Sequence, residues 1–250
     1  MKFLQVTQRD GIAEVTYSRG KVNALNEPAV EQLSACFHKL AADPEVKAVI
    51  ITGQGKFFSF GFDIPGFLSY SKEQFIGYLM KFTSFYLDLF LFEKPVVAAL
   101  NGHTIAGGCM IAIACDCRLM VAGKARISLN EITFGSSVFA GSVEILKYQV
   151  GAKAAESILY SGAMYSAEEA KRLGLIDQIC SEQSLMEEAV KTARDLGGKD
   201  GSAFRGIKYL LRRPVADEFA KRERDLILEF VDIWYSASTW KKIQEIKIHG

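Results

Sequence analysis

Two short apolar runs, each followed by a turn that contains glycine, constrain the fold of this chain most strongly. Ala48–Ile51 leads to Gly53, and Val96–Leu100 leads to a turn that ends at Gly107-Gly108. Short apolar runs bounded by turn residues are typical of buried strands, and the apolar segment after the second turn favours a helix. Strands that alternate with helices predict an α/β fold.

The rest of the chain follows the same alternation as far as Gly197-Gly198. Beyond these glycines only helical signals remain, which predicts a helical C-terminal region that packs on another element or subunit. Asp10-Gly11 predicts a hairpin turn. We expect strands at 4–8, 12–17, 118–121, 126–129 and 176–179, and helices at 72–92, 141–160 and 167–173, with further helices after Asn26 and Ser184.

Composition excludes several classes of protein. The chain of 250 residues is long enough for one large domain or a domain with an appendage. Its formal net charge of +1 gives no basic excess for binding nucleic acid. No apolar run approaches the roughly 18 residues that span a bilayer, and no leader is visible, so a cytoplasmic protein without membrane contact is expected. Five scattered cysteines indicate free thiols rather than disulfides.

The familiar catalytic motifs do not occur in the sequence. There is no G-x-S-x-G elbow, no P-loop and no H-E-x-x-H. The chain has only three histidines, too few to suggest a metal cluster, and we therefore expect no metal site: His38, His103 and His249.

Two turns carry the functional signal. Phe57–Ile64 reads FFSFGFDI, and Asn101–Cys109 reads NGHTIAGGC. Each turn has the glycines that allow backbone N–H groups to face a ligand, and the second turn places them at a helix N-terminus, which favours negative charge. Taken alone, either turn is also compatible with a simple connection.

The two turns, in this order and about 40 residues apart, resemble the paired signatures of the crotonase (enoyl-CoA hydratase/isomerase) superfamily. The likeness continues through Cys115–Arg118, Leu129–Glu131 and Ala163–Ile179. This resemblance implies a spiral of ββα units that holds the active site in residues 1–195. It also implies a helical region at 196–250 that assembles homotrimers or hexamers. The implied substrate is an acyl-CoA thioester, with no other cofactor.

By this resemblance, the N–H groups of Phe62 and Gly107 form an oxyanion hole for the thioester carbonyl. Removing a proton from carbon 2 of an acyl-CoA moves charge onto that oxygen, and the loss of one such donor typically costs about 3–4 kcal/mol. The segment 21–26 resembles the region that receives the CoA arm. The residues implied in substrate and CoA binding are Lys21, Ala24, Phe60, Gly61, Asp63, Ile64 and Asn130.

The hydratases of this family use two glutamates, and this chain retains one of the two positions. Met110 occupies the first position, where a thioether cannot take a proton, and Glu131 matches the second. One carboxylate is sufficient to move a proton from carbon 2 to carbon 4, which lie about 2.5 Å apart. The segments 106–109 and 127–131 also resemble those of Δ3,Δ2-enoyl-CoA isomerases. Isomerase activity is therefore favoured, with Glu131 as the catalytic base in a site kept dry by Ile127, Ile132, Phe134 and Phe139.

Three alternatives stay open at this point. They are a hydratase in which another acid replaces Met110, a decarboxylase or thioesterase that uses the same oxyanion hole, and a non-catalytic acyl-CoA-binding protein. His103, Asp63 and Asp116 are interpreted as structural. The basic residues near the C-terminus are interpreted as a solvated helix face, and the resemblance implies that a few of them meet CoA phosphates: Lys208, Arg212, Arg213, Lys221, Arg222, Arg224, Lys241 and Lys242.

Overall fold

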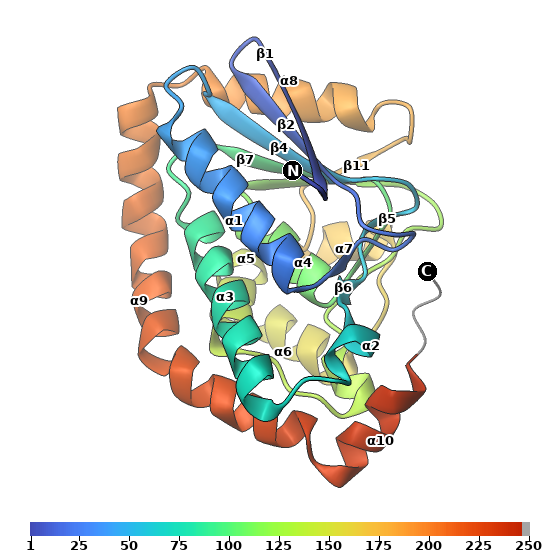
Figure 1. Cartoon of the computed structure of the whole chain (residues 1–250). Helices are drawn as coiled ribbons and strands as arrows, with labels where there is room; N and C mark the ends of the chain where they lie inside the picture. The colour runs from blue at the N-terminus through green and yellow to red at the C-terminus, as the bar shows by residue number, and fades with distance from the viewer. Residues whose placement is uncertain (247–250) are drawn as a thin grey trace.

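The computed structural model describes residues 1–246 and contains two principal β-sheets with helices packed around them (Figure 1). The larger sheet is parallel except for the hairpin at its edge, and the smaller sheet is parallel throughout. In spatial order the larger sheet contains β1 (Leu4–Arg9), β2 (Ile12–Tyr17), β4 (Ala48–Gly53), β7 (Val96–Leu100), β9 (Cys117–Val121) and β11 (Gln178–Cys180). The smaller sheet contains β10 (Ile127–Ser128), β8 (His103–Ile105) and β5 (Phe57–Ser59), and β3 (Ala24–Leu25) pairs separately with β6 (Gly61–Phe62).

Successive pairs of strands repeat one arrangement along the chain. The first strand of each pair, β4, β7 or β9, joins the larger sheet, and the second, β5, β8 or β10, joins the smaller one. Helices follow the pairs in turn: α3 (Lys72–Phe90) after β5, α4 (Gly107–Ala114) after β8, and η1 (Glu131–Phe134) with α5 (Ala140–Val150) after β10. Because the strands keep their order in both sheets, the repeats form a spiral of ββα units, as the family resemblance implied.

Local signals account for most element boundaries. Asp10 and Gly11 adopt positive φ angles of 51° and 77°, the conformation expected of a tight hairpin turn. The side chain of Asn26 accepts a hydrogen bond from the Ala29 amide at the start of α1 (Glu27–Ala42). Helix α7 (Ala167–Leu173) has the predicted capping box and ends at Gly174.

Two predicted boundaries were wrong. The helix expected at 141–160 is divided into α5 and α6 (Ala152–Ser161), because Gly151 adopts a φ of 80° that the interior of a helix does not allow. The last strand begins at Gln178 and not at residue 176. Leu175 and Ile176 are buried without joining the sheet, so their apolar character marks packing rather than pairing.

The C-terminal region is helical, as predicted. Helix α8 (Leu185–Gly197) covers one face of the larger sheet. Helix α9 (Gly201–Trp234) then packs along α5 and α3 and turns beneath α3 to reach α10 (Ala237–Glu245) (Figure 1). Pro214 lies inside α9, where it removes one helical hydrogen bond and favours a bend. The proposed division of the chain at residue 196 stays a prediction.

Two of the basic residues that the sequence placed on a solvated face are buried. The carboxylate of Asp116 accepts a hydrogen bond from Lys208 at 2.7 Å and forms an ion pair with Arg212 at 2.8 Å. Both cations are nearly inaccessible, and burial lowers the pKa of Lys208 to about 8 against the opposing effect of Asp116. This cluster attaches α9 to the end of α4. Amphipathic periodicity could not reveal it, because the partner lies about 90 residues away.

Two further expectations concern the cysteines and membrane-spanning helices. All five cysteines are free thiols, as predicted, and four of them are buried. Among residues 1–246, the helices are too short or too polar to provide a membrane-spanning segment.

Replacing Asp116 with Asn is expected to lower the free energy of unfolding by about 3–5 kcal/mol, because two buried cations lose their counter-charge. The matched control is Asp217→Asn, which breaks the exposed Arg213–Asp217 pair at 2.7 Å and is expected to cost less than about 1 kcal/mol. Urea denaturation of both variants measures the difference. Equal losses would contradict a structural role for the buried cluster.

Candidate active site

Three segments of the candidate site leave the same edge of the smaller sheet. Strands β5, β8 and β10 run parallel, so their carboxyl ends lie together, and they continue into 60–62, 106–107 and 130–131 respectively. The amide of Ala106 donates a hydrogen bond to the carbonyl of Ser128 at 2.8 Å, which fixes the second segment against the third. The sheet therefore gathers residues that are about 70 positions apart in the chain.

Glycines allow the first two segments to touch. A Cβ on Gly61, whose φ is 90°, would lie 2.9 Å from the backbone nitrogen of Gly107, and one on Gly108 would lie 2.5 Å from the carbonyl oxygen of Ser59. A Cβ on Gly107 would lie 3.0 Å from the ring of Phe62. Gly107 is also the first residue of α4, so its N–H has no acceptor within the helix.

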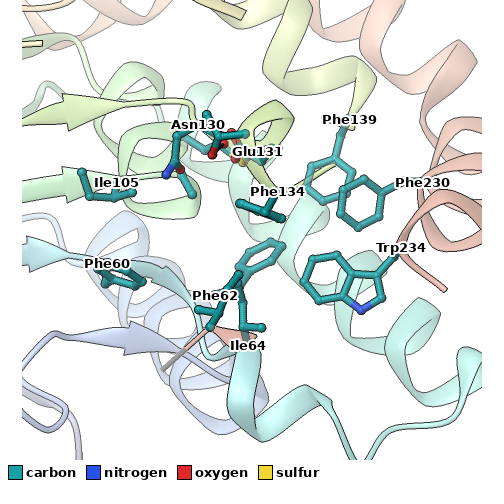
Figure 2. Close-up of a pocket in the computed structure, with 14 residues that line it drawn as sticks. Phe60, Phe62, Ile64, Ile105, Asn130, Glu131, Phe134, Phe139, Phe230 and Trp234 are labelled. Carbon is teal, nitrogen blue, oxygen red and sulfur yellow. Dashed lines mark hydrogen bonds between the residues drawn. The ribbon is translucent and has the colours of Figure 1, made fainter. Parts of the chain in front are cut away.

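A cavity of about 280 Å³ opens beside these segments (Figure 2). Its wall is mostly apolar and aromatic, and residues from the smaller sheet's edge face residues from α9. The lining residues are Phe60, Phe62, Ile64, Ile105, Ala106, Met110, Asn130, Glu131, Thr133, Phe134, Phe139, Phe230, Trp234 and Ile246.

Glu131 is the carboxylate of this cavity, and it is the first residue of η1. The residue is only 6% exposed, and within residues 1–246 its Oε2 has no hydrogen-bond partner. Burial raises the pKa of the Glu131 carboxyl to about 7, against the smaller opposing effect of its own backbone amide. A carboxyl with these properties can exchange a proton near neutral pH. The neighbouring Asn130 also has a buried, unpartnered Oδ1.

The expectation of an apolar environment for Glu131 is confirmed in part. Phe134 and Phe139 line the cavity, and Met110 faces it at the position where a second glutamate was considered. Ile127 is fully buried but is not part of the lining. Ile132 was wrongly expected to face the cavity: it is about half exposed and lines a separate hollow of about 510 Å³. The tight turn of η1 directs Ile132 away from Glu131.

The residues that the resemblance assigned to CoA and substrate binding are distributed around the site. Phe60, Ile64 and Asn130 line the cavity, and Gly61 lies between two lining residues. The other three, Lys21, Ala24 and Asp63, do not line it. Their contact with CoA stays a prediction.

Asp63 has the structural role expected of it. Its carboxylate pairs with Arg19 at 2.5 Å and caps the short helix α2 (Ile64–Phe67) through the amide of Gly66. The carbonyl of Ala24 accepts hydrogen bonds from Tyr17 and Arg19. Through Arg19, these contacts fix strand β3 beside Asp63, which directly follows β6.

Sequence reasoning missed part of the wall. The sequence predicted only a packed helical region here, but Phe230 and Trp234 of that region line the cavity, together with Ile246 beyond α10. Their four-residue spacing indicates a shared helix face, yet no local signal tells where a 34-residue helix returns to the core. Ala106 was also missed. It lines the cavity with a φ of 49°, a strained conformation for a residue with a side chain.

The structure also addresses metal and histidine chemistry. Within residues 1–246, no cluster of three or more His, Cys, Asp or Glu side chains is arranged to hold a metal ion. His103 packs against the ring of Phe57 at 5.1 Å and does not line the cavity, which agrees with a structural role. His38 lies at the surface beside Asp88, and His249 lies outside the described residues.

Comparison with known proteins identifies the family. A model of the enoyl-CoA hydratase/isomerase family matches residues 7–232. The chain belongs to this family.

Among its relatives is the mitochondrial enoyl-CoA hydratase of Pongo abelii, 34% identical over 176 residues that cover 70% of this chain and 59% of that protein. The short-chain-enoyl-CoA hydratase of Clostridium acetobutylicum is 31% identical over 83% of this chain and 80% of that one. The crystal structure of human mitochondrial Δ3-Δ2-enoyl-CoA isomerase superposes with a TM-score of 0.93, covering 97% of this chain and 96% of that chain at 25% identity. The fold is therefore that of the crotonases, and the names of the relatives include both activities.

Replacing Gly61 with Ala is expected to separate the two turns, because the new methyl group would meet the backbone of Ile105 and Gly107 at 2.8–2.9 Å. Gly55→Ala is the matched control, since Gly55 has a similar φ of 79° with nothing within 4 Å of its added Cβ. The control should lose only about 1–2 kcal/mol from backbone strain. Chemical denaturation should show a larger loss for Gly61→Ala. Similar losses would mean that the turns do not depend on this contact.

The raised pKa of Glu131 predicts how the free energy of unfolding changes with pH. A pKa raised from 4.5 to about 7 favours the folded state below pH 4.5 and disfavours it as the pH rises through 7. Glu131→Gln removes this titration. Burial also raises the pKa of Glu223, but that group is present in both proteins, so its contribution cancels in the difference between their free energies of unfolding. Relative to the unmodified protein, the variant should gain about 3 kcal/mol between pH 4.5 and pH 8 in urea denaturation. A difference that does not vary with pH would show that Glu131 is not desolvated.

Proposed function

We propose that this protein is an acyl-CoA enzyme, specifically a Δ3,Δ2-enoyl-CoA isomerase that uses Glu131 as its proton carrier. One observation carries the proposal. Among residues 1–246, Glu131 is the sole Asp or Glu that lines the cavity, and the lining also contains Met110 at the position of the second glutamate of the hydratases. An isomerase needs one carboxylate, whereas the family's hydratases use two.

In this mechanism the ionised carboxylate of Glu131 removes a proton from carbon 2 of a 3-enoyl-CoA. The electron pair moves onto the thioester oxygen and gives a dienolate. Glu131 then returns the same proton to carbon 4, and the double bond becomes conjugated with the thioester. The two carbons are about 2.5 Å apart, so a small rotation of one side chain serves both transfers.

The proposed oxyanion hole stabilises the intermediate charge. Its donors are the N–H groups of Phe62 and Gly107, and the contact between their segments through Gly61 and Gly108 supports the pairing. Backbone donors are preorganised, so they need no rearrangement when the charge develops. The N-terminal end of α4 adds a favourable dipole at Gly107.

The apolar wall supports isomerisation over water addition. Phe62, Phe139 and Phe230 lie within a connected aromatic cluster, with ring centroids 6.1 Å apart for the first pair and 4.6 Å for the second. The three phenyl rings themselves offer no polar group to an attacking water, and Glu131 is the one carboxylate among the described residues that line the cavity. The aromatic wall also keeps Glu131 desolvated, which strengthens it as a base.

Hydratase activity is the second candidate, because relatives such as the Clostridium protein carry that name. Hydration requires a second acid in place of Met110. The other buried glutamate, Glu223, cannot serve as that acid because it does not line the cavity. Decarboxylase, thioesterase and purely binding functions would use the same oxyanion hole, but none of them accounts for a desolvated Glu131 as directly.

We also propose that the protein works as a homotrimer or a dimer of trimers, with CoA entering only as part of the substrate. Exposed apolar residues on the first half of α9 support an association surface there: Ile207, Tyr209, Leu210 and Leu211.

The proposal is tested with 3-hexenoyl-CoA and 2-hexenoyl-CoA, with the products separated by chromatography. The protein should convert the first into the conjugated ester, and Glu131→Gln should lower kcat by at least about 100-fold because the proton carrier is lost. Met164→Gln, a change at an exposed position, should leave the rate unchanged. Rapid hydration of 2-hexenoyl-CoA would contradict the isomerase proposal. CoA binding without turnover would favour a binding protein.

A further inference from the structure

The C-terminal helix α10 is attached to the segment that carries Glu131. The hydroxyl of Thr239 donates a hydrogen bond to the carbonyl of Gly135 at 2.8 Å. Thr239 is only 3% exposed, and Gly135 ends η1 in the left-handed conformation, with a φ of 84°. The Thr239 hydroxyl is shielded from solvent, and its bond holds the part-buried carbonyl of Gly135 in one place.

The chain of hydrogen bonds continues from Gly135 to Glu131 itself. The amide of Gly135 donates to the carbonyls of Glu131 and Ile132, and the amide of Ser136 donates to the carbonyl of Glu131 at 3.0 Å. Thr239 therefore reaches the backbone of Glu131 through one intervening peptide. Because a single 3₁₀ turn has poor hydrogen-bond geometry, η1 depends on such outside support for its position.

Other contacts make α10 a firm support. Ile243 is fully buried, and the ring of Trp240 stacks on Tyr235 with centroids 4.8 Å apart. The hydroxyl of Tyr235 donates to the carbonyl of Tyr70 at 2.8 Å, which connects the end of α9 to the loop before α3. Directly after α10, Ile246 lines the cavity. The helix therefore contacts η1 through Thr239 and is followed directly by a residue that lines the cavity.

We infer that Thr239 is a positioning residue: through its hydrogen bond to Gly135, it fixes η1 so that the Glu131 carboxyl points into the cavity. This inference rests on the proposed function of Glu131. Without the bond, η1 loses a fixed end and Glu131 samples several orientations. Proton transfer suffers because it requires both carbons within reach, while substrate contacts elsewhere in the cavity stay in place.

Thr239→Val tests the inference, because valine keeps the shape of threonine and removes only the hydroxyl. We expect kcat for 3-hexenoyl-CoA to fall about tenfold, with KM changed less than about twofold, since misplacement of a reacting group affects the chemical step. Thr239→Ser restores the hydroxyl and should restore kcat. Ser238→Ala is the matched control, because it removes an exposed hydroxyl from the adjacent position of α10.

A kcat of Thr239→Val equal to that of the unmodified protein would overturn the inference, and so would a failure of Thr239→Ser to restore it. If Thr239→Val does not fold, Thr239→Ala measures the loss of the same hydroxyl. Glu131→Gln separates the two ideas. Full activity in that variant contradicts the proposed function, whereas its inactivity beside a fully active Thr239→Val contradicts only the role of Thr239.

Discussion

The site depends on the shared edge of three short parallel strands. Strands β5, β8 and β10 together contain only eight residues, yet their carboxyl ends bring together the two glycine turns and Glu131. A side chain at Gly61 or Gly108 would collide with the backbone of the neighbouring turn. The two glycines are therefore as necessary to this arrangement as the strand pairing. The ββα spiral explains the convergence, since each repeat supplies one strand to the same small sheet.

The aromatic wall then determines what Glu131 can do. A carboxyl in such a cavity is costly when it is charged, so its proton is held more tightly than in water. That cost is also what makes the group an effective base near neutral pH. The C-terminal region completes the wall with Phe230 and Trp234. It also supports the fold through the buried pairs of Asp116. The same helix therefore serves both stability and the site.

The sequence predicted what depends on local pattern and motif. The hairpin, the capped helices, the two turns and the positions of Glu131 and Asn130 follow from residues close together in the chain. The break at Gly151 was missed because a lone glycine is tolerated within a helical pattern. Lys208 and Arg212 were misplaced because their partner is distant in sequence. Phe230 and Trp234 were missed because the path of α9 depends on tertiary packing.

The central claim concerns one carboxyl and one reacting thioester, and a crystal structure with an unreactive 3-enoyl-CoA analogue tests it most directly. The account predicts a Glu131 oxygen within about 3.5 Å of both carbon 2 and carbon 4. It also predicts the thioester oxygen within about 3.1 Å of the Phe62 and Gly107 nitrogens. A complex in which the carboxyl faces neither carbon, or in which the oxygen contacts neither amide, would contradict it.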